Sequence, residues 1–64
     1  SAEAIVEATL NYGDWNDVQT LIKILGIQKV AGIFRTKSQP SALGRQNYRP
    51  VVVNYFSLYF NKYA

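Results

Sequence analysis

Apolar residues recur at helical spacing in the middle of the chain, and this pattern gives the clearest structural prediction. One helix face, at positions i, i+3, i+4 and i+7, collects Val18, Leu21, Ile22 and Leu25. We expect Gly26 to end this helix, because glycine enters the left-handed conformation of a helix C-terminus without steric cost.

A shorter helix is predicted to precede it, over residues 2–11. Its apolar face is formed by Ile5, Val6, Thr9 and Leu10. We expect Gly13 to end this helix in the left-handed conformation, with Tyr12 folded back over the helix end.

Residues 11–17 join the two helices and contain the single tryptophan of the chain. Asp14 is a good N-cap for the second helix, and Asp17 adds another acidic residue to its first turn. Two roles are open for Trp15. It is either a core residue packed on the C-terminal aromatic residues or an exposed anchor of the kind enriched at protein interfaces.

A third helix is expected directly after Gly26. Its apolar face has the same spacing, with Ile27, Val30, Ala31 and Phe34. Gly32 lies inside this helix, where glycine costs about 1 kcal/mol relative to alanine, and we expect it to allow another backbone to approach closely. Residues 36–48 lack periodicity and are rich in turn-forming residues, so we interpret them as one long loop.

The C-terminal segment, residues 49–64, is open to two interpretations. Its consecutive valines, together with tyrosine and phenylalanine, favour a strand by propensity. However, Pro50 suits the first position of a helix, and the segment is unusually long for a strand. One helical face would collect Val52, Tyr55, Phe56, Tyr59, Phe60 and Tyr63. We therefore predict a helix.

The composition is that of one small globular domain spanning residues 1–64. Hydrophobic residues make up 48% of the chain and charged residues 17%, which suits a packed core and not a disordered chain. Together with the helical patterns, this predicts an all-α fold, a compact bundle of about four short helices.

The residue types argue against catalytic and metal chemistry. Histidine and cysteine are both absent, so the chain lacks the common general base, the common nucleophile and the usual zinc ligands. We therefore predict no enzyme activity, no cofactor and no metal site. No apolar run is long enough to span a membrane, and the lack of cysteine is compatible with the cytoplasm, which is the expected location.

Charge is distributed unevenly along the chain. All four acidic residues lie within residues 3–17, and all seven basic residues follow them. This asymmetry suggests a polyanionic partner or an acidic protein surface, although ordinary solvated faces give the same pattern. The candidate contacts to nucleic acid are Lys29, Arg35, Lys37, Arg45 and Arg49.

The second and third predicted helices, joined by Gly26, have the layout of a helix-turn-helix. Ile22 stands where such a unit usually has a small residue, and the third helix offers few side chains that read base edges. Two interpretations remain open here: a unit that contacts phosphates, or an ordinary helical hairpin of a bundle.

Aromatic residues give the other candidate surface. Tyrosine is enriched with arginine at protein interfaces, and the same pair also binds single-stranded nucleic acid. Most of the tyrosines are explained more simply as core residues. The candidate residues for contact with a protein partner or a second copy of the chain are Trp15, Tyr55, Tyr59 and Tyr63.

Two segments of the chain resemble a family of small, uncharacterised bacterial helical domains. Members carry a Tyr-Gly-Asp segment, a Leu-rich helix that ends in glycine, and an ending of the type Asn-[Phe/Tyr]-[Phe/Trp]-Ser-Leu-[Tyr/Phe]-Phe. The matching positions here are Tyr12, Gly13, Asp14 and Trp15, residues 21–26, Pro50, and residues 54–60.

This family looks like the small neighbour of nucleotidyltransferase-type toxins of the abortive-infection class. The resemblance implies a non-enzymatic, antitoxin-like partner of another protein, with a nucleic-acid-binding regulatory domain as the alternative. The family's usual N-terminal lead-in has no counterpart here, which leaves open that residues 1–64 are a fragment of a longer chain.

Overall fold

A computed structural model of the chain describes residues 1–38 and 48–64. These residues contain no strand, and they form four α-helices: α1 (Ala2–Tyr12), α2 (Trp15–Leu25), α3 (Ile27–Lys37) and α4 (Pro50–Tyr63). The predicted all-α bundle of four short helices is confirmed, and the C-terminal segment is a helix that begins at Pro50 as expected.

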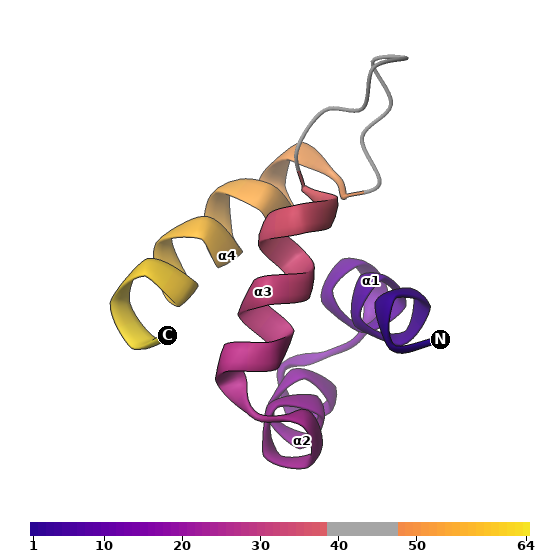
Figure 1. Cartoon of the computed structure of the whole chain (residues 1–64). Coiled ribbons are helices and arrows are strands. Elements are labelled where there is room, and N and C mark those ends of the chain that lie inside the picture. Colours follow the sequence, from indigo (N-terminus) through magenta and orange to yellow (C-terminus); the bar gives the residue numbers. More distant parts are fainter. Residues whose placement is uncertain (39–47) are drawn as a thin grey trace.

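Helix α3 is the centre of the bundle. It contacts all three other helices, with α1 and α2 on one side of it and α4 on the other (Figure 1). Every residue of the buried apolar core except Tyr48, just before α4, lies on a predicted helix face. Three residues of those faces, Ile5, Tyr55 and Tyr63, are exposed. The core consists of Val6, Leu10, Val18, Leu21, Val30, Ala31, Phe34, Tyr48, Val52, Phe56 and Phe60.

Gly13 ends α1, but for a different reason from the one predicted. Its φ of −75° and ψ of 161° are extended and not left-handed. Glycine is required because a Cβ at this position would lie 2.7 Å from the carbonyl oxygen of Thr9 and 3.0 Å from the Cβ of Asp17. Tyr12 is exposed and is not packed over the helix end.

The predicted start of α2 is confirmed. Asp14 is its N-cap, and the Asp14 side chain accepts a hydrogen bond from the backbone N–H of Asp17 at 2.9 Å. The Asp17 side chain accepts in turn from the backbone N–H of Asp14 at 3.1 Å. This reciprocal capping box satisfies two backbone donors of the helix N-terminus. It also fixes Trp15 as the first residue of α2.

Gly26 ends α2 and directly precedes α3, as predicted. Its φ of 89° lies in the region that side-chain-bearing residues rarely adopt, so glycine is needed for its backbone conformation. Helix α3 then continues through Lys37, so the loop predicted over residues 36–48 begins later than expected. The rest of that predicted loop, residues 39–47, lies outside the described residues.

Gly32 does not serve the close backbone approach that was predicted. It is exposed, and among the described residues no atom outside its own helix lies within 4 Å of a Cβ built at this position. We therefore expect Gly32→Ala to raise the free energy of unfolding by about 1 kcal/mol, because alanine lowers the entropic cost of the helix interior. Thermal unfolding followed by circular dichroism would show a higher midpoint; an unchanged or lower midpoint would mean that Gly32 has a packing role.

Candidate protein-binding surface

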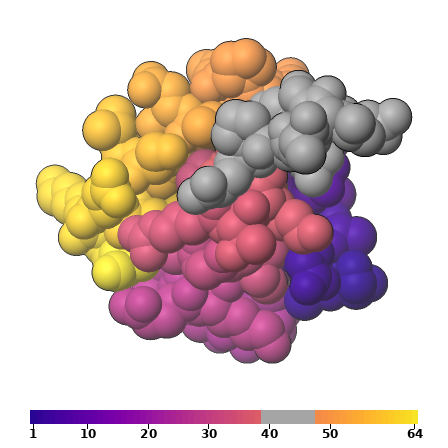
Figure 2. Space-filling model, turned by 45° about the horizontal axis from the view of Figure 1, so that its top comes forward, coloured from indigo at the N-terminus to yellow at the C-terminus, as the bar shows by residue number. Residues whose placement is uncertain are grey.

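Helix α4 has apolar side chains on two of its faces. One face is buried against the bundle and contains Val52, Phe56 and Phe60. The other carries Val51 and Leu58, and Leu58 is 65% exposed. Helix α4 lies along one side of the molecule (Figure 2), and its main helix contact among the described residues is with α3. The second apolar face is therefore left open to solvent.

Trp15, in the first turn of α2, lies beside this face of α4 and extends the exposed apolar surface onto α2. Its ring lies edge-on to the rings of Tyr55 and Tyr59, at centroid distances of 6.3 and 5.4 Å. Edge-to-face pairs of this kind stabilise by about 0.5–1.5 kcal/mol beyond the effect of area burial. The side chain of Trp15 nevertheless remains 45% exposed. Trp15 thus packs on the C-terminal aromatic residues but is not a core residue, and it keeps nearly half of its surface available for contact.

The four predicted interaction residues lie around one shallow hollow of about 460 Å³. The residues lining it are Trp15, Tyr55, Leu58, Tyr59, Lys62 and Tyr63. The ammonium of Lys62 lies 5.3 Å from the ring centroid of Tyr63, within the range of a cation–π contact. We refer to these six residues, together with Val51, as the α4 surface.

One member of the α4 surface that lines the hollow, Leu58, was missed by sequence reasoning, because it falls outside the aromatic helix face on which the prediction was based. A signal was available in its spacing, because Leu58 and Lys62 continue a second stripe that begins at Val51 and Tyr55. The tyrosines also divide differently from the prediction that most are core. Tyr48 is buried and Tyr59 is partly buried, whereas Tyr55 and Tyr63 are half-exposed.

A cluster of exposed apolar residues is more informative than the same residues scattered singly, which is normal for a protein surface. The α4 surface combines one tryptophan, three tyrosines, a leucine and a valine on adjoining elements. Protein interfaces are enriched in aromatic residues and depleted of charged ones, lysine included, at their centre. The aromatic content of the α4 surface fits this composition, and Lys62 is its one charged residue.

The two arginines that the structure describes among the predicted nucleic-acid contacts are engaged within the chain. The guanidinium of Arg49 donates a hydrogen bond to the carbonyl oxygen of Asn11 at 2.7 Å. The backbone N–H of Arg49 donates to the side-chain oxygen of Asn11 at 3.1 Å. The guanidinium of Arg35 donates to the carbonyl oxygen of Phe60 at 3.1 Å. A cation near the C-terminus of a helix is stabilised by the helix dipole. These arginines tie α1 and α3 to the two ends of α4.

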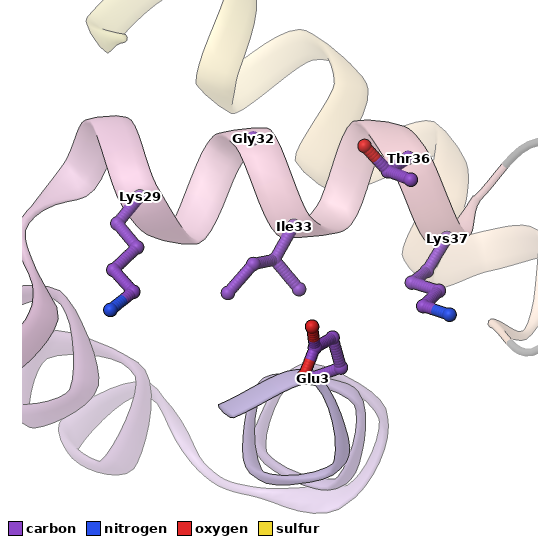
Figure 3. A pocket seen from close by; sticks show the side chains of 6 residues that line it. All are labelled: Glu3, Lys29, Gly32, Ile33, Thr36 and Lys37. Atoms are coloured by element: carbon purple, nitrogen blue, oxygen red, sulfur yellow. The ribbon is translucent and has the colours of Figure 1, made fainter. Parts of the chain in front are cut away.

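Lys29 and Lys37 lie elsewhere, on the side of α3 that faces α1. They line a hollow of about 420 Å³ that also includes Glu3 of the first turn of α1. Figure 3 shows the side chain of Glu3 between the two lysines. A phosphate bound there would meet a negative charge as well as two positive ones, which weakens its attraction. Nucleic-acid binding through these residues stays a prediction, and Arg45 lies outside the described residues.

A further hollow of about 300 Å³, lined by three aliphatic residues, two threonines and Asp17, lies between α1 and α2. It is lined in part by Ile5 and Ile24, and Ile24 is 74% exposed. No aromatic residue lines it, whereas tryptophan and tyrosine dominate the binding energy of protein interfaces. It is the less favourable docking surface of the two, and Ile24 is a useful control position.

The described residues contain no group of three or more acidic, histidine or cysteine side chains placed to hold a metal ion. No helix in residues 1–38 and 48–64 is both long and apolar enough to cross a membrane.

Comparisons with known protein families, with curated proteins and with solved structures find no match to this chain. Function is therefore inferred from the chemistry of the surface described above.

Proposed function

We propose that the chain is a non-enzymatic binding module that recognises a protein partner through the α4 surface. The observation that supports this most directly is the cluster of exposed aromatic and aliphatic side chains around the hollow between Trp15 and α4. Aromatic anchors in such hollows supply most of the binding energy of protein interfaces. An antitoxin-like role, which the motif resemblance implies, is one form that such a module would take.

The exposed apolar area of the α4 surface is large enough to offset most of the cost of association. A half-exposed aromatic ring still offers on the order of 100 Å², which is worth about 2.5 kcal/mol when it is fully covered. Three such rings and Leu58 together give about 10 kcal/mol, within the 4–15 kcal/mol that association costs, and the apolar surface of the partner adds to the gain. Area alone does not set the affinity, but because the surplus is small, we expect most of the binding to be lost when one central side chain is made polar.

Selection from a displayed library of helical peptides, with the immobilised chain as the target, tests the proposal. We expect enriched peptides whose binding is lost in Leu58→Asp, because a carboxylate in the hollow would have to be desolvated by apolar contacts. The matched control is Ile24→Asp, which makes the same change at another exposed residue, on α2. This control variant should bind the selected peptides as the unmodified chain does.

Circular dichroism of both variants would first establish that their helices are retained. Enriched peptides that bind Leu58→Asp as tightly as the unmodified chain would contradict the proposal. Binding lost in Ile24→Asp instead would place the binding surface between α1 and α2.

A further inference from the structure

The exposed face of α4 has the spacing of a helix-pairing seam. At i, i+4, i+7 and i+11 it carries Val51, Tyr55, Leu58 and Lys62. These intervals are those of the a and d positions of a heptad, which keep one stripe of a helix facing a second helix. Trp15 packs against Tyr55 and forms one wall of the hollow beside this stripe. The surface therefore fits a helix laid along α4.

Lys62 determines which helix fits best, because it is the one charged residue of α4. If a second copy of the chain paired in parallel, Lys62 would face Lys62. If it paired antiparallel, Lys62 would face Val51, with Arg49 nearby. Since α4 contains no acidic residue, in neither arrangement does the α4 of the second copy offer the ammonium a carboxylate, and covering an unpaired charge is costly.

The acidic residues of the chain do not neutralise Lys62. Glu3 and Glu7 are on α1, and none of the four acidic residues lines the hollow. Asp14 and Asp17, the closest to Trp15 in sequence, are held in the capping box of α2. The charge at the C-terminal end of the seam is therefore positive and complementary to an acidic group.

We infer that the occupant of the α4 surface is an amphipathic helix of another protein, with apolar residues at heptad spacing and an acidic residue opposite Lys62. This inference rests on the proposed function and adds the chemistry of the partner. The apolar residues would supply affinity by covering Tyr55 and Leu58. The pair with Lys62 would set the register and select against other helices, which is the usual contribution of a charge beside an apolar seam.

Two designed helical peptides without tryptophan test the inference. Both carry leucine at heptad spacing, and they differ only in having Glu or Gln opposite Lys62. Binding is read from the emission of Trp15, the single tryptophan of the chain, whose half-exposed ring would lose contact with water on binding. We expect the Glu peptide to bind about two- to fivefold more tightly at low salt, the effect of a partly exposed ion pair.

The difference in affinity between the Glu and Gln peptides should disappear in Lys62→Gln. It should persist in Lys23→Gln, which removes an exposed lysine from α2. If the two peptides bind the unmodified chain with equal affinity while binding is still lost in Leu58→Asp, the inference of an acidic residue opposite Lys62 is overturned but the proposed function is not. Failure of both peptides, together with failure of the library selection, would overturn both.

The oligomeric state of the chain tests the other possible occupant of the α4 surface, a second copy of the chain. Light scattering on the chain alone should give a monomer. A dimer that becomes a monomer in Leu58→Asp and stays a dimer in Ile24→Asp would overturn the inference, because the occupant would then be a second copy.

Discussion

Replacing Phe34 with alanine is expected to lower the free energy of unfolding by about 3–5 kcal/mol. The side chain is 1% exposed, and its ring meets those of Tyr48, Phe56 and Phe60 at centroid distances of 5.1, 6.2 and 5.5 Å. The substitution therefore leaves a cavity where α3 meets α4. A domain of this length has a total stability of roughly 3–10 kcal/mol, so the loss is a large share of the whole.

Urea unfolding followed by circular dichroism measures this effect. Leu58→Ala is the matched control, because it truncates an exposed side chain of α4 and should change the free energy of unfolding by no more than about 0.5 kcal/mol. A urea midpoint for Phe34→Ala as high as that for Leu58→Ala would mean that Phe34 is not packed between α3 and α4.

Alkaline pH is expected to destabilise the fold through Tyr48. Burial, with a smaller contribution from the negative charge of Glu7, raises the pKa of Tyr48 from 10.0 to about 12. In the unfolded chain this phenol releases its proton near pH 10, so between pH 10 and 12 the folded state binds more protons than the unfolded state. The contribution of Tyr48 to the free energy of unfolding is therefore fully present below about pH 10 and is lost as pH rises toward 12, a loss of about 3 kcal/mol in all.

Tyr48→Phe isolates this contribution, since phenylalanine keeps the ring in the core and removes the titrating group. We expect urea midpoints of the unmodified chain to fall more steeply between pH 9 and 12 than those of Tyr48→Phe. Tyr63→Phe is the matched control, because it removes a tyrosine hydroxyl at a half-exposed position, and it should follow the unmodified chain. Parallel curves for the unmodified chain and Tyr48→Phe would show that the Tyr48 phenol is not buried in the folded state.

The helices could be predicted from the sequence because local signals and burial agree in them. Val18 and Leu21 mark the buried face of α2, Asp14 caps its N-terminus, and Gly26 ends it. Each of these signals acts over one or two helical turns. The conformation of Gly13 could not be predicted in the same way, because it depends on how closely Thr9 and Asp17 approach once α1 and α2 are packed.

The candidate site was predicted only in part, because exposure depends on contacts between distant segments. Tyr55 and Phe56 have similar sequence signals, but α3 covers Phe56 and leaves Tyr55 half-exposed. Likewise, Arg35 is a typical phosphate contact in sequence, and only the packing of α3 on α4 brings it to the carbonyl oxygen of Phe60. Tyr48 belongs to the core for the same reason, although it was expected in a loop.

The most direct test of the central claim, that the α4 surface binds a protein partner, is NMR mapping of a selected helical peptide on the isotope-labelled chain. We predict that chemical-shift changes concentrate on the indole N–H of Trp15 and on the exposed side of α4, around Tyr55, Leu58 and Lys62. Changes concentrated instead around Ile5 and Ile24, or around Lys29 and Lys37, would contradict the claim and place the binding surface on another part of the molecule.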